Sequence, residues 1–253
     1  MFYSKNLKKL KNIDHCFFSK KKGFSKGIYK SLNCGKGSKD SKKNINKNLI
    51  FVSSKMGVPK TNLILMHQTH SNKVVEIKKN NYKTKIKADA MITKMKGFAL
   101  AVVTADCVPI ILYDVKNQII GCVHAGWKGA YLDIIKNTIN KFKKMNSNNL
   151  IYACVGPCIG QKSYEVDLDF FKKFIDISEK NKKYFSYKSS NKKLFNLRKF
   201  VTDKLLEYKI KVDQVNRDTF TEKSNFFSYR RSTKLDEKDY GRCISAVCMP
   251  KLY

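Results

Sequence analysis

Short apolar runs rich in β-branched residues recur along the chain, and they constrain its fold more than any other feature. They predict strands at 15–19, 63–66, 74–77, 99–103, 110–113, 119–124, 150–155, 211–215, 226–229 and 244–249. Helical periodicity is confined to 44–56, 130–145, 167–180 and 197–208, the last with Asn196 as its predicted N-cap. Lys-, Ser- and Asn-rich stretches at 36–44 and 180–193 predict loops. The pattern predicts an α/β or α+β fold with a mixed sheet.

Length and composition fit one cytoplasmic catalytic domain spanning 1–253, with a lysine-rich N-terminal segment. A chain of 253 residues that is 42% hydrophobic can bury a sizeable core. Thr104, Asp106 and Pro109 interrupt the longest apolar stretch, 98–113, which is shorter than the roughly 18 residues that a membrane span requires. We therefore expect no membrane partner. The eight cysteines are too sparse for a secreted disulfide scaffold, so we expect reduced thiols. We also expect a monomer.

The net charge of +32 raises the question of a nucleic-acid partner. Lysine supplies nearly all of the basic residues, and the first fifty residues are rich in it. Residues 97–135 carry only Lys116 and Lys128 against three aspartates. No helix-turn-helix or aromatic RNA-binding motif stands out. We therefore expect a solvated basic arm or face that could meet RNA or anionic lipid nonspecifically, and no specific nucleic acid.

Three residues with metal-binding side chains follow or end apolar runs: His70, Cys107 and His124. Strand ends commonly present side chains to a cleft, so two imidazoles and one thiolate could meet there. Such a set suits a three-ligand zinc site with an open fourth position. The alternative is that Cys107 and His124 are ordinary buried residues. Their wide spacing matches no local zinc-finger pattern.

The order of the motifs is more specific than any one of them. The chain reads SLNCG at 31–35, HQTHSNKVVEI at 67–77, ADAMIT at 88–93, TADCVPIILYD at 104–114, VHAGWKG at 123–129, GPCIGQKSYEV at 156–166 and FFSYRR…GR at 226–242. From about residue 15 to its end, the chain resembles the YfiH-like, laccase-domain family, which is regarded as a family of purine nucleoside phosphorylases. Where that family has a threonine–arginine–x–glycine–glycine stretch, this chain has Ser19, Lys20, Lys21, Lys22 and Gly23.

The resemblance implies a layered α/β sandwich and a zinc site made by His70, Cys107 and His124, which would also be the catalytic residues. It implies phosphorolysis of adenosine, inosine and S-methyl-5′-thioadenosine, with purine nucleosides and inorganic phosphate as partners. Zinc would equally suit adenosine deamination, since it lowers the pKa of water. Asn33 and Gln68 are candidate substrate-binding residues. Candidates for the general acid are Asp106, Gln68 and Glu165.

The few arginines are informative in a chain so rich in lysine. Because the composition favours lysine so strongly, an arginine indicates a position that requires a planar, bidentate guanidinium. Arg230, Arg231 and Arg242 lie close together in the sequence. They are candidates to clamp phosphate or to brace the site through carboxylates. The alternative is a structural ion pair with Asp236, Glu237 or Asp239.

The segment after His124 leaves a strand and enters the helix predicted at 130–145, so it could hold an anion at a helix N-terminus. The glycines and the proline at 156–160 either contribute to a phosphate site or only form a turn. Trp127 either stacks on a purine or belongs to the core. Strand alternation places His67 on the face opposite His70, outside the metal set.

Three other functions compete with phosphorolysis. Cys107 and His124 could form the nucleophile and base of a cysteine hydrolase or amidase, for example one acting on peptidoglycan precursors. A multicopper oxidase needs many imidazoles, and four histidines in the whole chain argue against it. A basic nucleic-acid-binding protein would depend on the N-terminal lysines and not on Cys107.

Overall fold

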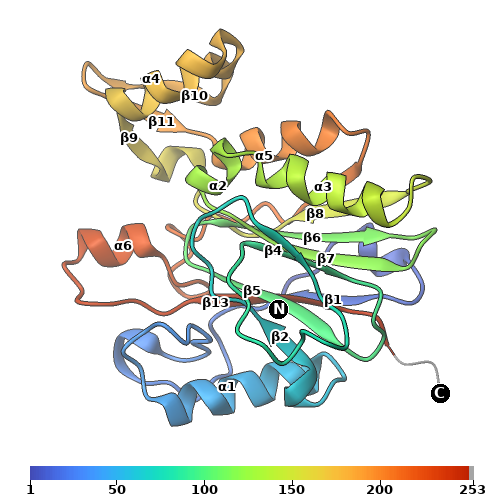
Figure 1. The fold of residues 1–253 in the computed structure, drawn as a ribbon. Coiled ribbons are helices and arrows are strands. Elements are labelled where there is room, and N and C mark those ends of the chain that lie inside the picture. Colours follow the sequence, from blue (N-terminus) through green and yellow to red (C-terminus); the bar gives the residue numbers. More distant parts are fainter. Residues whose placement is uncertain (251–253) are drawn as a thin grey trace.

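Two stacked β-sheets form the body of the protein, and helices cover their outer faces (Figure 1). The structure, a computed structural model, describes residues 1–250. The four-stranded sheet has the order β1 (Asp14–Phe17), β13 (Cys243–Cys248), β5 (Ala99–Thr104), β2 (Leu63–Leu65). The six-stranded sheet has the order β12 (Lys211–Gln214), β8 (Ile151–Val155), β6 (Val108–Asp114), β7 (Ile119–Ala125), β4 (Ala90–Thr93), β3 (Val74–Glu76). Both sheets mix parallel and antiparallel pairs, so the predicted α/β class with a mixed sheet is confirmed.

An apolar core lies between the two sheets. Leu100 and Val102 of β5 belong to it together with Ile111 of β6 and Ile120 of β7. All residues of β6 and β7 are buried. Strands that are buried on both faces read as continuous apolar runs, which explains the long apolar stretch at 98–113.

Helices bury apolar side chains against the outer face of each sheet. Helix α1 (Lys42–Lys55) packs Leu49 and its neighbours on the four-stranded sheet. On the other side, α3 (Ile134–Met145) and α5 (Leu197–Leu206) cover the six-stranded sheet, with Ile139 in that core. The resulting order of layers, helix, sheet, sheet and helix, is the layered sandwich that the family resemblance implies.

A smaller unit with an aromatic interior stands at one end of the sandwich, at the upper left of Figure 1. It contains β9 (Glu165–Asp167), α4 (Leu168–Ile177), β10 (Phe185–Ser189) and β11 (Lys192–Phe195). Phe170 and Phe174 of α4 pack edge-on or tilted against Phe195, with ring centroids 5.3 and 4.8 Å away. Such contacts stabilise beyond the area they bury. Phe174 and Phe195 belong to the same core cluster as Ile139 of α3, so this unit is packed on the outer core of the six-stranded sheet.

Short helices complete the chain. They are η1 (Leu7–Lys9), η2 (Gly27–Tyr29), η3 (Lys60–Asn62), α2 (Trp127–Tyr131), η4 (Gln161–Ser163), η5 (Glu179–Tyr184) and α6 (Tyr229–Lys234).

The structure corrects three predictions of secondary structure. The helix predicted at 130–145 is two helices, because Asp133 adopts a left-handed φ of 63° between α2 and α3. The loop predicted at 180–193 contains η5, β10 and the start of β11. The strand predicted at 226–229 is the entry to α6, where Ser228 accepts a hydrogen bond from the backbone N–H of Arg231.

The lysine-rich N-terminal segment is packed on the body of the protein. Phe2 exchanges two backbone hydrogen bonds with Phe17 of β1, at 2.8 and 2.9 Å. Ser4 donates its hydroxyl to the carboxylate of Asp213 on β12, and Leu7 is fully buried. The segment is thus a basic face of the fold and not a free arm. None of the helices in residues 1–250 is long and apolar enough to cross a bilayer.

Candidate metal centre

Cys107 lies in the short loop between β5 and β6, and Asp106 fixes this loop. Asp106 has a left-handed φ of 85° and a buried carboxylate. This carboxylate accepts hydrogen bonds from the hydroxyls of Thr219 and Ser228 and from the backbone N–H of Arg230, at 2.7 to 2.9 Å. Burial raises the pKa of the Asp106 carboxyl. Its oxygens are taken up by these donors, so Asp106 holds the Cys107 loop to the entry of α6.

His124 lies near the end of β7, opposite Pro109 of β6. Its ring is buried, and Nδ1 lies 2.8 Å from Oδ1 of Asp89, the residue that precedes β4. A histidine whose Nδ1 is held by a carboxylate directs Nε2 to the other side, which is the usual arrangement of a metal-binding imidazole.

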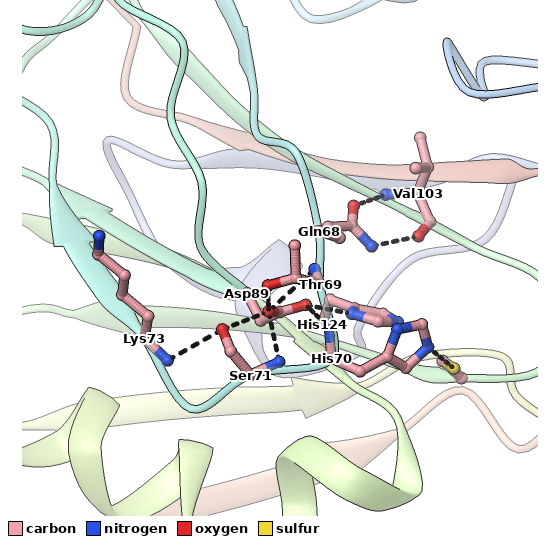
Figure 2. Close-up of polar contacts among 9 residues, drawn as sticks. Gln68, Thr69, His70, Ser71, Lys73, Asp89, Val103 and His124 are labelled. Atoms are coloured by element: carbon pink, nitrogen blue, oxygen red, sulfur yellow. Dashed lines mark hydrogen bonds and ion pairs between the residues drawn. The ribbon is translucent and has the colours of Figure 1, made fainter.

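His70 lies in the loop after β2, and the same aspartate shapes this loop. The carboxylate of Asp89 accepts the backbone N–H groups of Thr69, His70 and Ser71, at 3.2, 3.0 and 2.7 Å, and the hydroxyl of Ser71 (Figure 2). This wrapping places His70 in the left-handed region, with a φ of 57°. The loop is not the continuous strand that the sequence suggested, and His67 lies outside the group that His70 joins.

The three predicted residues meet at one point. The Sγ of Cys107 lies 3.7 Å from Nε2 of His70, and the rings of His70 and His124 are 4.7 Å apart in an edge-on arrangement. One ligand atom from each of the three lies within 4.8 Å of the others. Gly126 makes this possible, since a Cβ there would lie 2.7 Å from Cδ2 of His70 and 3.0 Å from Sγ of Cys107. Two imidazoles and one thiol around a small gap fit a bound metal ion.

Electrostatics favour the ionised thiol. Burial opposes the thiolate, but the charge and hydrogen bonds of His124 and His70 outweigh it and lower the pKa of Cys107 to about 6. Burial likewise opposes the imidazolium of His124, but the Cys107 thiolate and Asp89 raise its pKa to about 9. Burial would raise the pKa of Asp89, yet hydrogen bonds from His124 and Ser71 hold it well below its ordinary range. Without metal, the site is therefore a thiolate–imidazolium pair backed by a carboxylate.

Two pockets meet at this group. The larger, about 780 Å³, is lined by His70, Cys107 and His124. The smaller, about 490 Å³, shares His70 and Cys107 and has aromatic walls from Trp127, Tyr164 and Phe170 of its own. Tyr229 of α6 borders both. The metal-binding atoms thus lie on a wall that is common to two cavities of ligand size.

Among the other predicted residues, Gln68 lines the larger pocket and Asn33 does not. The Gln68 side chain exchanges two hydrogen bonds of 2.8 Å with the backbone of Val103 on β5, so its amide anchors the His70 loop (Figure 2). Asn33 is fully buried, and its Oδ1 accepts the backbone N–H groups of Gly35 and Arg242. This corrects the interpretation of Asn33, which organises the pocket wall from behind because its polar atoms are already bonded.

The two adjacent arginines have different surroundings. Arg230 lines the smaller pocket, lies over the ring of Tyr164 and donates one hydrogen bond, to the carbonyl of Glu165. Arg231 donates three hydrogen bonds to the carbonyls of Thr219, Phe220 and Phe226, and it lines neither pocket. The interpretation of Arg231 as a phosphate or carboxylate clamp is corrected, since backbone carbonyls occupy its guanidinium.

Trp127 and Glu165 line the smaller pocket. Trp127 packs edge-on against Phe170, with ring centroids 5.1 Å apart, so it serves packing and pocket at once. The segment after His124 enters α2, which has five residues, and not the longer helix that the sequence predicts at 130–145.

Sequence reasoning missed Asp89. Asp89 lies in the ADAMIT motif at 88–93, which contributes to the family resemblance. The available signal is an acidic residue directly before an apolar run. Asp89 is fully buried, and aspartate is rarely fully buried unless it is paired.

Fold and site together define a layered α/β protein in which two histidines and one cysteine, a candidate metal-binding group, lie at the junction of two pockets. A profile of the family described as multi-copper polyphenol oxidoreductase laccase matches residues 14–250, and the chain belongs to this family, which includes the YfiH proteins. A purine nucleoside phosphorylase of Rickettsia conorii is 37% identical over 189 residues, 74% of this chain and 78% of the relative. One of Haemophilus influenzae is 32% identical over 240 residues, 94% of both chains.

Solved structures share the fold. A Neisseria meningitidis protein superposes with a TM-score of 0.85 at 27% identity, covering 95% of this chain and 96% of the other. The hypothetical protein YfiH of Bacillus licheniformis superposes with a TM-score of 0.87 at 26% identity, covering 94% and 92%. The resemblance deduced from the motifs is therefore confirmed.

Proposed function

We propose that the protein is a zinc-dependent purine nucleoside phosphorylase that cleaves adenosine, inosine and S-methyl-5′-thioadenosine with inorganic phosphate. The observation that carries the proposal is the convergence of His70, Cys107 and His124 on the wall shared by two pockets. One pocket offers aromatic faces suited to a purine, and the other is cationic. The names of the Rickettsia and Haemophilus relatives support the same activity.

Zinc fits the donor set better than the copper of the family description. A multicopper centre needs many imidazoles, and this chain has four histidines. Of these, His15 is buried elsewhere and accepts a hydrogen bond from the backbone of Ser4. Two histidines and one cysteine with an open position are typical of catalytic zinc. Bound zinc would supply Lewis-acid polarisation of a substrate oxygen.

The chain's own residues would orient both reactants. Asp89 holds His124 and the His70 loop in place, and Asp106 holds the Cys107 loop. Trp127 and Tyr164 would stack on the purine, with Arg230 and Glu165 at the same pocket as polar contacts. Holding the ribosyl carbon next to phosphate converts a bimolecular reaction into an effectively unimolecular one.

A nucleoside panel tests the proposal. Zinc-loaded protein is incubated with each nucleoside, with and without phosphate, and free base, the corresponding sugar 1-phosphate and ammonia are quantified. We expect phosphate-dependent release of base, lost in His124→Ala, with lysine-to-glutamine changes at Lys8, Lys9 and Lys11 as the matched control. If ammonia is released without free base, the activity is deamination and not phosphorolysis. If none of the nucleosides yields either product, the proposal is contradicted.

A cysteine hydrolase is the second candidate, because the lowered pKa of Cys107 beside His124 is what a nucleophilic thiolate requires. Its substrate would contain an amide bond, as peptidoglycan precursors do. Chelation separates the two functions. A hydrolase would keep its activity without metal and lose it on alkylation of Cys107, whereas the phosphorylase would lose activity on chelation.

We further propose that the chain acts as a single-domain monomer in the cytoplasm. The metal-binding residues and both pockets come from one chain, so no partner subunit is needed to complete the site. All eight cysteines are free thiols, which suits a reducing compartment. Light scattering of the purified protein tests the monomer directly.

A further inference from the structure

The larger pocket has a strong bias of charge. Lys36, Lys85 and Arg242 line it, together with His67 and the metal-binding group, and none of its described lining residues is an aspartate or a glutamate. The smaller pocket differs, since Asp106, Glu165 and Asp167 line it beside its two cations. A cavity with cations and no carboxylate concentrates anions. The proposed nucleoside is neutral and does not account for this charge.

A tight turn at residues 35–38 forms part of the cationic wall. Gly35 lets Arg242 lie against it, because a Cβ at Gly35 would lie 2.7 Å from Cδ of Arg242. The buried side chain of Asn33 binds the backbone N–H groups of both residues, at 3.0 and 2.9 Å, and donates to the hydroxyl of Ser38. The turn and the arginine are therefore held in one fixed arrangement, and this explains the SLNCG and GR motifs together.

Several donors of this wall have no acceptor within residues 1–250. The backbone N–H groups of Lys36 and Gly37 form no hydrogen bond in this part of the chain. The guanidinium of Arg242 stacks on the ring of Tyr240 at 4.2 Å and donates a single hydrogen bond, to the carbonyl of that residue. Stacking fixes the plane of the guanidinium and leaves its remaining N–H groups for a ligand.

Asp40 and Asp239 support this frame, and within residues 1–250 neither forms a salt bridge with Lys36, Lys85 or Arg242, although the charge of Arg242 acts on Asp239. Asp40 accepts hydrogen bonds from Ser25 and Asn33. Asp239 accepts from the hydroxyl of Tyr29 and the backbone of Lys39. Neither carboxylate lines the larger pocket.

We propose that the 35–38 turn, Lys36, Lys85 and Arg242 form a binding site for a phosphoryl group. A guanidinium fork with lysines and free backbone N–H groups matches the oxygens of a phosphate dianion. The group is either inorganic phosphate or the phosphate ester of a nucleotide. The first source rests on the proposed phosphorolysis, whereas the second does not.

Binding is measured directly on the zinc-loaded protein, by calorimetry with inorganic phosphate, adenosine and adenosine 5′-monophosphate. The variants are Arg242→Gln and Lys36→Gln, the second at an exposed turn position that cannot disturb the core. Arg217→Gln is the matched control, because Arg217 is an exposed arginine that stacks on Phe2 and lines neither pocket. None of these measurements needs turnover.

If inorganic phosphate is the ligand, Arg242→Gln weakens its binding at least tenfold, Lys36→Gln weakens it severalfold, and Arg217→Gln leaves it unchanged. If a nucleotide is the ligand, the wild type binds the monophosphate more tightly than adenosine, and Arg242→Gln removes this advantage. Either result supports the site. If Arg242→Gln and Lys36→Gln bind both anions as tightly as the wild type does, the proposal is overturned. A protein that binds phosphate here but releases no base refutes the phosphorylase and retains the site.

Discussion

Asp89 lies 2.8 Å from Nδ1 of His124, and both side chains are almost completely withdrawn from solvent. The same carboxylate receives the backbone N–H of His70. One buried aspartate thus positions two of the three proposed zinc ligands, and it precedes β4, whereas His124 lies in β7 and His70 follows β2.

Replacing Asp89 with asparagine tests this relationship. The amide keeps the size of the side chain but loses the charge that fixes the His124 tautomer and the His70 loop. We expect zinc affinity to fall by about 10–100-fold, the usual effect of losing a carboxylate behind a metal-binding histidine. Competition with a chromophoric chelator measures this affinity.

Asp114→Asn is the control for this change. Asp114 is equally buried, and it binds Asn117 and Asn149 away from both pockets. Its loss should lower stability and leave zinc affinity unaltered. Equal zinc affinities in wild type and Asp89→Asn would contradict the assigned role of Asp89.

Cys107 should titrate below its ordinary range in metal-free protein. Because its pKa is lowered to about 6, the thiolate persists at pH 7 and is lost only as the pH falls through about 6. The rate of alkylation by iodoacetamide should therefore rise with a midpoint near pH 6, and His124→Ala should move the midpoint upward. The other seven cysteines are buried, so labelling reports on Cys107. A wild-type midpoint near pH 9 would exclude the thiolate–imidazolium pair.

Gly126→Ala should damage the metal centre with little effect on the rest of the fold. The added methyl group would lie 2.7 Å from the His70 ring, so that ring or the Cys107 loop must shift. A shift of this kind loosens a site that needs close geometry, and we expect zinc affinity to fall about tenfold or more. Chelator competition, with circular dichroism as the check on folding, decides the matter, and undiminished affinity would speak against the crowding argument.

Arg231→Lys should lower stability and leave phosphate binding intact. An ammonium cannot reach all three carbonyls that the guanidinium now joins, and losing two such hydrogen bonds costs about 2–4 kcal/mol. Urea denaturation measures the loss. Arg230→Lys is the comparison, since Arg230 makes one such bond and faces the smaller pocket. A rise in the KM for phosphate without loss of stability in Arg231→Lys would restore the clamp interpretation.

Much of the fold could be predicted from periodicity, because most strands are apolar runs and α5 has a plain N-cap at Asn196. The prediction failed where tertiary contacts decide the local structure. Phe226 and Phe227 look like a strand, but they are buried beside α6, whose cap Ser228 also binds Asp106. The β10–β11 hairpin is rich in lysine and serine, so its sequence reads as a loop.

The grouping of His70, Cys107 and His124 could be anticipated from the sequence because imidazole and thiol side chains are typical metal ligands. The supporting residues could not be assigned in the same way. Asp89 acts through backbone N–H groups at 69–71, and Asn33 acts through the backbone of Gly35 and Arg242. A single sequence does not reveal which distant backbone groups a polar side chain will meet.

Titration of metal-free protein with zinc, followed by phosphate-dependent release of base from adenosine and inosine, tests the central claim most directly. Activity should rise in proportion to the added zinc and level off at one zinc per chain, and Cys107→Ala should show neither the tight binding nor the activity. Full activity without metal, or a plateau that requires several metal ions per chain, would contradict the account.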